Sequence, residues 1–465
     1  MNKILTLADC VLSANTGLDA IKRAPIVTVN TGIRCIRIQD ISQSKVFQDW
    51  GFTEVTSNNF EKFQLKSNDI LIARTGGSIG VNTFISNDLQ AVYNNGLIRI
   101  RVDTEKFYPK FIYFILQSDK YREHINSIAF GTAAQPNMKI KDFLSFEFME
   151  ILLDKQKQIA KILSDLDEKI HFNNQINHTL ESIAQAIFKS WFIDFEPVRA
   201  KIAAKQEGKD PELAAMCAMS GKSEEELQHM SKDDFAELQA TAALFPDELM
   251  ESELGEVPKG WEVSTVGDQI QTAGGATPST KNVEFWDNGT HHWTTPKDLS
   301  NLTDKVLLNT ERKITDAGLK KISSGLLPKD TVLMSSRAPV GYLALAKIKV
   351  AINQGYIAIL PNKKYSAEYL IQWCEANMAE IKGRASGTTF QEISKKNFRE
   401  INFICPDEKI VASYTKTVRT LYDEITSKAK ENQSLINLRD TLLLKLMSGE
   451  ISLNKNMGSI DDKEN

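Results

Sequence analysis

Arginine, amide and hydroxyl side chains gather in short Gly- or Pro-containing segments, and each such gathering occurs twice along the chain. Arginine can pair bidentately with guanine, and Asn or Gln with adenine, whereas hydroxyls hold phosphates. For each residue the alternative is a local turn in which the side chain caps its own loop. The candidate DNA-contacting residues are Arg74, Thr75, Ser78, Asn94, Asn95, Thr132, Gln135 and Lys139 in the first half, and Ser335, Ser336, Arg337, Asn353, Gln354, Arg384, Thr388, Thr389, Gln391 and Lys395 in the second.

No familiar catalytic signature accompanies these residues. The segment SGKS at 220–223 lacks the upstream glycine of a phosphate-binding loop, and Asp407 in PDEKI is interpreted as a helix cap. His291 and His292 are adjacent in an expected strand, where alternation directs them to opposite faces. A Gly-rich dinucleotide fingerprint and the Asn-Pro-Pro-aromatic tetrad of an amino-methyltransferase are also missing from the sequence. The sequence therefore predicts a binding protein without a catalytic, metal or cofactor site of its own.

Composition and charge limit the class of protein. The 465 residues are 42% hydrophobic and 25% charged, the balance of a globular protein with two or three domains. The five cysteines lie far apart and no window approaches the roughly 18 apolar residues of a membrane span, so we expect a cytoplasmic protein with no membrane partner. The net charge is −4, but residues 205–253 hold four lysines against thirteen acids, which leaves a positive surplus elsewhere. A basic cluster at 381–399 is typical of solvated faces and also suits phosphate contacts.

One architecture is written twice in this sequence, at an offset of about 255 to 261 residues. In the pair of segments 130–143 and 386–398, Gly131 and Gly387 are expected to adopt backbone conformations that need glycine. Phe143 and Phe398 are expected to fill the core. The matched pairs are LTLAD (5–9) with STVGD (264–268), IRCIRIQDIS (33–42) with HHWTTPKDLS (291–300), NDILIARTGGSIG (68–80) with KDTVLMSSRAPVG (329–341), AVYNNGLIRI (91–100) with VAINQGYIAI (350–359), and FGTAAQPNMKIKDF (130–143) with SGTTFQEISKKNF (386–398).

A long heptad pattern follows each copy. Apolar residues alternate at spacings of four and three from Leu163 to Trp191, and again from Tyr414 to Leu446. A helix of about 37 residues is about 55 Å long, more than a small domain needs, so each helix is expected to pair with the other. Antiparallel pairing is favoured because it needs no long return path, although a parallel pair stays open. Polar residues interrupt both seams and are expected to fix the register; they are Asn173, Asn177, Lys428 and Asn432.

These elements predict an α+β fold in which two similar recognition domains are separated by a pair of long helices. The helices are expected to form an antiparallel coiled coil with pseudo-two-fold symmetry. The linker is acidic and partly helical, with one helix capped by Ser231. The expected boundaries are 1–150 for the first domain, 151–195 for the first spacer helix, 196–257 for the linker, 258–405 for the second domain, 406–450 for the second spacer helix, and 451–465 for a polar, disordered tail.

The chain resembles the specificity subunits of type I restriction-modification systems along its whole length. The resemblance is carried by the paired segments above in their order, together with QKQIAKILSDLDEKI at the start of the first long helix, SWFIDFEPV at its end, and SELGEVPKGWEV at the start of the second half. The first half lacks the opening Gly260–Trp261 pair of the second, which is expected to trim its entry without abolishing the domain.

This resemblance implies a non-catalytic subunit that binds double-stranded DNA. Each target-recognition domain would read one half of a bipartite site, and the paired helices would set the gap and dock the methyltransferase subunits. S-adenosylmethionine, ATP and Mg, with methyl transfer and cleavage, would belong to the partner methyltransferase and restriction or translocase subunits. The alternatives are a nuclease or methyltransferase with an unrecognised site, or a two-headed scaffold that binds protein.

Overall fold

The computed structural model describes residues 3–43, 45–129, 137–300, 302–387, 391–448 and 450, and the chain divides into two compact units. Unit 1 comprises residues 1–170 and 434–465, and unit 2 comprises residues 171–433. The long helices α6 (Leu153–Phe192) and α17 (Glu408–Ser448) each contribute one part to each unit. The predicted tail at 451–465 lies outside the described residues.

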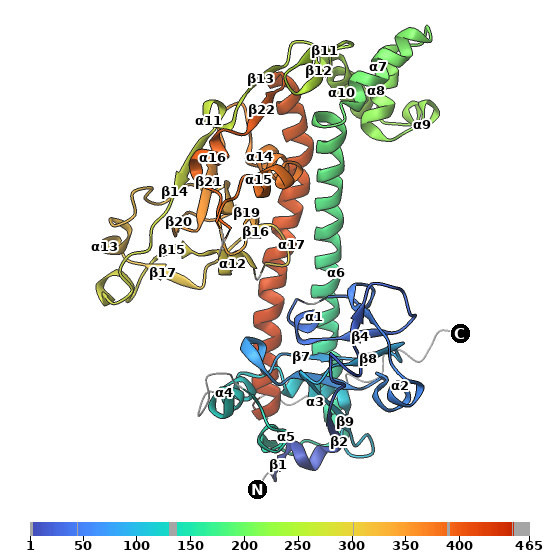
Figure 1. Ribbon diagram of the computed structural model, residues 1–465, viewed down its shortest axis with the longest axis vertical. Coiled ribbons are helices and arrows are strands. Elements are labelled where there is room, and N and C mark those ends of the chain that lie inside the picture. The colour runs from blue at the N-terminus through green and yellow to red at the C-terminus, as the bar shows by residue number, and fades with distance from the viewer. Residues whose placement is uncertain are drawn as a thin grey trace. The chain divides into compact units, whose positions relative to one another are not determined.

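Unit 1 is built around two four-stranded sheets (Figure 1). The central strands β6 and β9 of the first sheet consist mostly of buried β-branched and Leu residues, which explains why they form its middle. The first sheet has the order β2 (Val11–Thr16), β9 (Leu97–Val102), β6 (Ile70–Ala73) and β7 (Asn82–Phe84), and the second β3 (Ile26–Val27), β5 (Gly51–Thr53), β4 (Arg34–Ile36) and β8 (Ala91–Tyr93).

Short helices connect these strands and cover them. Helix α3 begins with Pro109, which suits the first helical position, and buries five of its residues against the sheet. Helix α2 is capped by Thr56, whose side chain accepts a hydrogen bond from the Asn59 backbone N–H. The helices are η1 (Leu7–Cys10), α1 (Ile38–Ser42), η2 (Phe47–Asp49), α2 (Ser57–Phe63), η3 (Gly76–Ser78), α3 (Pro109–Ile115), α4 (Asp119–Ala129) and α5 (Ile140–Leu144).

Unit 2 repeats this architecture and confirms the predicted duplication. The order β2-β9-β6-β7 recurs as β14 (Gln271–Gly274), β21 (Tyr356–Leu360), β18 (Thr331–Ser335) and β19 (Leu343–Ala346), to which β16 (Val306–Leu307) is added. The parallel pair β4-β8 recurs as β15 (His291–Thr294) with β20 (Val350–Ile352), and β17 (Arg312–Ile314) completes that sheet. The helices between them are α11 (Val266–Gln269), η4 (Val283–Phe285), α12 (Pro296–Ser300), α13 (Asp316–Leu319), α14 (Ala367–Ala376), α15 (Met378–Gly383) and α16 (Lys395–Arg399).

The entry and exit strands also repeat. Strand β1 (Ile4–Thr6) pairs with β10 (Glu147–Met149) over three residues, and β13 (Glu262–Thr265) pairs with β22 (Asn402–Cys405) over four. The first domain is therefore trimmed at its entry but keeps the pair, as its missing Gly-Trp opening predicts. In both copies the entry strand ends in a Thr that hydrogen-bonds the Asp three residues later, Thr6 with Asp9 and Thr265 with Asp268.

The backbone corrects the alignment of one matched segment by one residue. The Arg74 N–H donates to the Gly96 carbonyl, and the same place in unit 2 is taken by Ser336, whose N–H donates to the Gly355 carbonyl. The sequence alignment instead places Arg74 opposite Ser335. The loop from Ser336 to Gly341 is one residue shorter than the loop from Arg74 to Gly80. The sequence alignment conceals this difference, because the two matched segments have the same total length.

The acidic linker is more regular than its composition suggests. It forms α7 (Glu196–Gln206), α8 (Pro211–Ser220), α9 (Glu224–Gln228) and α10 (Lys232–Leu244), followed by the hairpin β11 (Leu249–Ser252) and β12 (Gly255–Pro258). Its own small core contains Met216, Leu227 and Ala242. The predicted Ser231 cap is confirmed, because its side chain accepts from the Asp234 N–H. The many charges lie on exposed faces, so they do not prevent a few apolar residues from packing.

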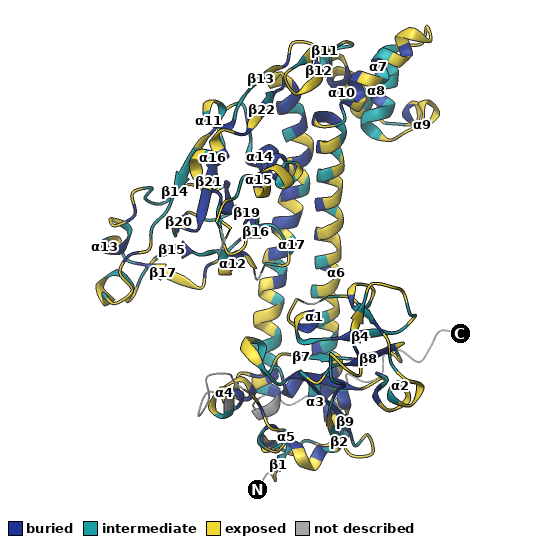
Figure 2. Ribbon diagram, viewed as in Figure 1, coloured by how far each residue is buried: buried dark blue, intermediate teal, exposed yellow. Residues whose placement is uncertain are grey.

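The two long helices run antiparallel within each unit, as predicted (Figure 1). In unit 2, Asn173 of α6 bonds Asn432 of α17, whereas Phe188, farther along α6, contacts Tyr414, which lies earlier on α17. In unit 1, Asp167 pairs with Arg439. Figure 2 shows buried residues in the central strands and along one side of each long helix. None of the helices in the described ranges is both long and apolar enough to cross a membrane.

Candidate nucleic-acid interface

The segment after β6 and the segment before α5 meet in unit 1, although they are far apart in sequence. The Met138 N–H donates to the Arg74 carbonyl at 2.8 Å, and Met138 is buried, which anchors the pairing. The Arg74 guanidinium then donates from Nη2 to Asn137 Oδ1 at 3.0 Å. Thr75 forms an isolated β-bridge with Asn137, and Ser78 lies partly exposed at the end of η3. An arginine and an amide therefore stand side by side beside the loop.

Unit 2 assembles the same scaffold with different side chains. The Ile393 N–H donates to the Ser336 carbonyl at 3.0 Å, and Ile393 is buried as Met138 is. Arg337 forms an isolated β-bridge with Glu392, and its Nη1 lies 3.6 Å from Glu392 Oε2. The sequence reading missed Asn137 and Glu392. A signal was present, since each lies six residues before the buried Phe of its segment, Phe143 or Phe398.

Two of the candidate serines are buried, which corrects their assignment. Ser335 is fully buried, and its hydroxyl donates to the Pro339 carbonyl at 2.7 Å while accepting from the Tyr342 N–H at 2.8 Å. Ser336 has a relative exposure of 3% and serves the scaffold through its backbone. For Ser335 the alternative interpretation, a side chain that supports its own loop, fits the geometry. Neither serine belongs to the accessible set.

The turns after β8 and β20 carry the amide candidates. Asn95 and Gln354 are exposed, and Gln354 Oε1 accepts a hydrogen bond from Thr277 Oγ1 at 2.6 Å. Asn353 Oδ1 accepts from the Gly355 N–H at 2.8 Å, so that side chain closes its own turn. Asn94 Oδ1 is buried and has no hydrogen-bond partner in the described part of the chain. Asn95 and Gln354 are thus the more accessible of the four.

A glycine in each unit lets another segment approach these turns. A Cβ at Gly17 would lie 2.2 Å from the Tyr93 carbonyl oxygen, and a Cβ at Gly275 would lie 2.0 Å from that of Ile352. Carbon and oxygen atoms do not approach so closely, so both positions require glycine. The two glycines occupy equivalent places in the repeat, eight residues after Asp9 and seven after Asp268.

The remaining candidates lie in the matched segments 130–143 and 386–398 or, in the case of Arg384, just before the second. Lys139, Gln391 and Lys395 are exposed, whereas Arg384 is paired with Glu380 at 2.8 Å. The burial of Phe143 and Phe398 confirms their expected core role, and the φ of +126° confirms the expected backbone role of Gly387. The residues that lie outside the described ranges are Gly131, Thr132, Gln135, Thr388 and Thr389.

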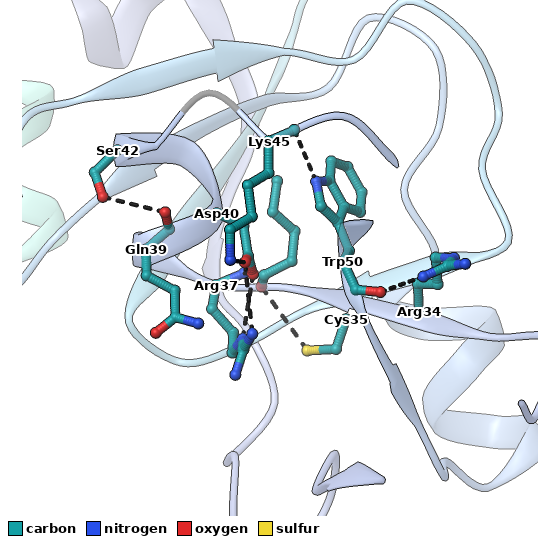
Figure 3. Close-up of polar contacts among 9 residues, drawn as sticks. Arg34, Cys35, Arg37, Gln39, Asp40, Ser42, Lys45 and Trp50 are labelled. Atoms are coloured by element: carbon teal, nitrogen blue, oxygen red, sulfur yellow. Dashed lines mark hydrogen bonds and ion pairs between the residues drawn. The ribbon is translucent and has the colours of Figure 1, made fainter. Parts of the chain in front are cut away.

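A further group of cationic side chains surrounds α1 in unit 1 (Figure 3). The buried Asp40 carboxylate accepts from the Arg37 backbone N–H at 2.9 Å and from Arg37 Nε at 3.2 Å, and it lies 3.4 Å from Lys45 Nζ. The Arg34 guanidinium stacks over the Phe52 ring, 4.1 Å from its centroid, and donates to the Trp50 carbonyl. The carboxylate caps the first turn of α1, and it holds two cations in place.

The polar seam residues are buried between the long helices, with one exception. Asn173, Asn177 and Asn432 are all buried, and Asn177 Nδ2 donates to Asp304 Oδ2 at 3.0 Å and to the Ile425 carbonyl at 3.4 Å. Lys428 instead lies 3.3 Å from Glu424 and 3.6 Å from Glu431, both on its own helix. Both of these ion pairs lie within α17 and do not reach across to α6.

Asp407, His291 and His292 all have structural partners. Asp407 Oδ1 accepts from the Lys409 N–H at 2.8 Å and caps α17, as predicted. His291 bonds Asp316 and His292 bonds Thr310, in agreement with opposite faces of β15. Burial raises the pKa of the Cys10 and Cys35 thiols to about 12, which keeps them protonated at neutral pH. Within the described ranges no three His, Cys, Asp or Glu residues are grouped to hold a metal ion.

Comparison with known proteins identifies the repeated architecture. The family model described as type I restriction modification DNA specificity domain matches residues 21–182 and 258–437. The chain belongs to this family of specificity subunits. It is 34% identical over 408 residues to the type I restriction enzyme HindI specificity subunit of Haemophilus influenzae, which covers 84% of this chain and 88% of the relative.

Two other similarities are lower, one in coverage and one in sequence identity. The MjaIX specificity subunit of Methanocaldococcus jannaschii is 36% identical over 190 residues, 40% of this chain and 44% of that protein. A crystal structure of the S subunit of a type I restriction-modification system from M. genitalium covers 96% of this chain and 95% of its own, with 17% identity and a TM-score of 0.47. Because the family model matches two ranges, this specificity subunit carries the DNA specificity domain twice, and it is a non-catalytic member of its enzyme class.

Proposed function

We propose that this specificity subunit reads a bipartite site in double-stranded DNA, with one half-site bound by each recognition domain. The observation that carries the proposal is the repeated loop pair, in which one backbone scaffold presents Arg74 and Asn137 in unit 1 and Arg337 and Glu392 in unit 2. A common scaffold supports a common mode of docking, and different side chains on it permit different sequences. Two different readers are what an asymmetric bipartite site requires.

The chemistry of each pair favours a different set of bases. Arginine recognises guanine and an asparagine amide recognises adenine, so Arg74 and Asn137 can read both purines. Glu392 can accept a hydrogen bond from the cytosine amino group, so the pair with Arg337 suits a G·C base pair. The side chains of Arg337 and Glu392 are 37% and 45% exposed. Each can therefore give up its contact with the other and form hydrogen bonds with a base edge instead. We therefore propose that the loop pairs discriminate the half-sites.

The partners in this proposal are methyltransferase subunits that dock on the long helices. Phe172, Ile176 and Ile183 are 60%, 40% and 43% exposed, and their spacing of four and seven places them on one face of α6. An exposed apolar stripe on a helix is typical of a surface covered by another protein. The partners would supply S-adenosylmethionine-dependent adenine methylation, and restriction or translocase subunits would supply ATP- and Mg-dependent cleavage. The specificity subunit itself would act in the cytoplasm without a cofactor.

The helices are proposed to set the gap between the two half-sites. Buried Asn residues fix the register of the antiparallel pair, because a shifted helix would leave their amides without partners. The test is selection of bound duplexes from a random pool by the subunit assembled with its methyltransferase subunits. A bipartite site with one fixed gap is expected, and enrichment of a single contiguous site would overturn the proposal. Insertion of one heptad into both helices should change the gap.

The two alternatives make different predictions for the same preparations. A scaffold that binds protein would bind duplex DNA weakly, and its binding would not fall steeply with salt, because steep dependence comes from counterions released at phosphates. An enzyme with an unrecognised site would modify or cleave DNA when the chain is alone with S-adenosylmethionine or a divalent metal ion. We expect steep salt dependence for the assembled complex and no turnover by the chain alone.

A further inference from the structure

A single carboxylate oxygen on α6 joins both long helices to the second recognition domain. Glu181 has a relative exposure of 9%, and its Oε1 accepts hydrogen bonds from three donors. The donors are Lys305 Nζ at 3.2 Å, Gln372 Nε2 at 3.1 Å and the Tyr422 hydroxyl at 3.2 Å. Lys305 lies just before β16 and Gln372 lies on α14, so both belong to the domain, whereas Tyr422 lies on α17.

A second contact lies one helical turn away from the first. Asn177 precedes Glu181 by four residues on α6, and its Nδ2 donates to Asp304 Oδ2 at 3.0 Å. Lys305 also reaches Glu375 of α14, with Nζ 2.9 Å from Oε2. Gln372 further donates to the Tyr422 hydroxyl at 2.8 Å, which closes the network. The adjacent residues Asp304 and Lys305 are thus held at two successive levels of α6.

The neighbouring charges and burial set the protonation of Lys305 and Asp304 in this network. Burial by itself would lower the pKa of Lys305, but the carboxylates of Glu181 and Glu375 outweigh that effect and raise it. Lys305 is therefore a cation in the folded protein. Burial raises the pKa of Asp304, and the nearby Glu181 carboxylate raises it further, while the bonds from Asn177 and the Val306 backbone lower it. Asp304 is held by direct hydrogen bonds rather than by a cation of this network.

Buried polar contacts of this kind select a geometry more than they add stability. The apolar surfaces around them, which include Ile371, Val418 and Tyr414 of the unit 2 core, can slide over one another at modest cost. A shift of the domain along α6 would instead take Lys305 and Gln372 away from Glu181 and leave that carboxylate, which is 9% exposed, without its cation, a costly arrangement. The loss of these hydrogen bonds is especially costly in the protein interior, because the low dielectric constant there strengthens each bond.

We infer that the Glu181 network is a positioning device, which fixes the second recognition domain on the long helices and thereby narrows the range of gaps that the complex accepts. The inference rests on the proposed function, because a gap has meaning only for a bipartite target. Glu181 does not touch DNA in this scheme. It acts through the placement of the loops of unit 2, including Arg337, relative to the helices to which that domain is bound.

The test uses the specificity subunit assembled with its methyltransferase subunits and three duplexes. The duplexes carry the two selected half-sites with the preferred gap, or with a gap one base pair shorter or longer. In the variants E181Q and E181L, the preference for the correct gap over the altered gaps should fall by about fivefold or more, the usual lower range of coupling between distant sites. A merely structural loss would weaken binding to all three duplexes by the same factor and leave the preference unchanged.

The matched control is E237Q, which removes an exposed carboxylate that pairs with Lys416 of α17 at 2.7 Å. It should keep the gap preference of the wild type. If either Glu181 variant fails to fold, Y422F removes one of the three donors and keeps the ring, and it should also broaden the accepted gaps. Equal preferences in wild type and all network variants, or an equal loss in E237Q, would overturn the inference. A wild-type complex without any gap preference would instead refute the proposed function.

Discussion

Asn173 of α6 donates from Nδ2 to Oδ1 of Asn432 on α17 at 2.9 Å, in the buried seam between the two helices. Asn432 in turn donates from Nδ2 to Oδ1 of Asn174 at 2.8 Å. These bonds form at one relative position of the two helices, because their amides are short and directional. We therefore propose that the Asn173–Asn432 pair specifies the register, whereas apolar residues such as Ile425 and Ala429 of α17 contribute to the core.

Replacing Asn173 by Leu should destabilise the chain by about 1–3 kcal/mol, because Asn432 Oδ1 is left buried without its donor. The double variant N173L/N432L should cost less than the single one, since both polar groups are gone. Urea unfolding followed by circular dichroism measures both changes. A double variant that loses as much as the sum of the two single variants would mean that the amides do not interact.

Replacing Arg74 by Ala should relax specificity in one half-site, and replacing Arg337 should relax it in the other. The expected loss is about 1–3 kcal/mol against the preferred base for each arginine that reads a base edge. Competition binding by the assembled complex, with duplexes substituted at each position of one half-site, measures the change. Loss of affinity that is equal for all sequences would assign the arginine to a phosphate instead.

A suitable control for these arginines is Lys106→Ala. Lys106 is exposed and pairs with Asp103, which directly follows β9. Arg74 instead bonds Gly96, which directly precedes β9, so the two sites lie at opposite ends of this strand. The variant removes one positive charge from unit 1 without touching the loop pair. It should leave the sequence preference of both half-sites unchanged, so any change in preference would point to a general effect of net charge.

Replacing Asp304 by Asn should stabilise the chain at neutral pH. Because burial raises the pKa of Asp304 in the folded protein, the folded state binds its proton more tightly than the unfolded state does. The stability that comes from this residue is greatest below its unfolded pKa of about 3.9, and it falls as pH rises through the raised folded pKa. The advantage of the variant should therefore be largest at pH 7 and vanish toward pH 4 in urea titrations. An advantage independent of pH would exclude this cause.

Replacing Gly275 by Ala should destabilise the second recognition domain by about 3 kcal/mol, because the added Cβ collides with backbone that cannot easily move. The neighbouring Gly274 is the matched control, since nothing lies within 4 Å of a Cβ built there. Thermal unfolding of G275A and G274A compares the two. Gly17→Ala should have the same effect in unit 1, and equal melting temperatures for G275A and G274A would contradict the proposed contact.

The sequence by itself determined the duplicated domains, the two long helices and the Ser231 cap. Each of these depends on local or periodic features, namely alternation in strands, heptads in helices and a hydroxyl just before an amphipathic helix. It also indicated the buried Phe143 and Phe398, because the same aromatic recurs at the same place in both copies. Such patterns are repeated along the chain, so they can be recognised without knowing which segments touch.

Only the tertiary structure decided which members of the motifs are accessible and which residues they meet. Ser335 ends β18 and Arg337 lies two residues later in the polar loop, yet one is fully buried and the other partly exposed. Asn137 reaches Arg74 across 63 positions, and Glu181 reaches Tyr422 across 241. Hydrogen bonds over such separations depend on how whole helices and strands pack together. Local patterns of residue types do not specify which elements come into contact.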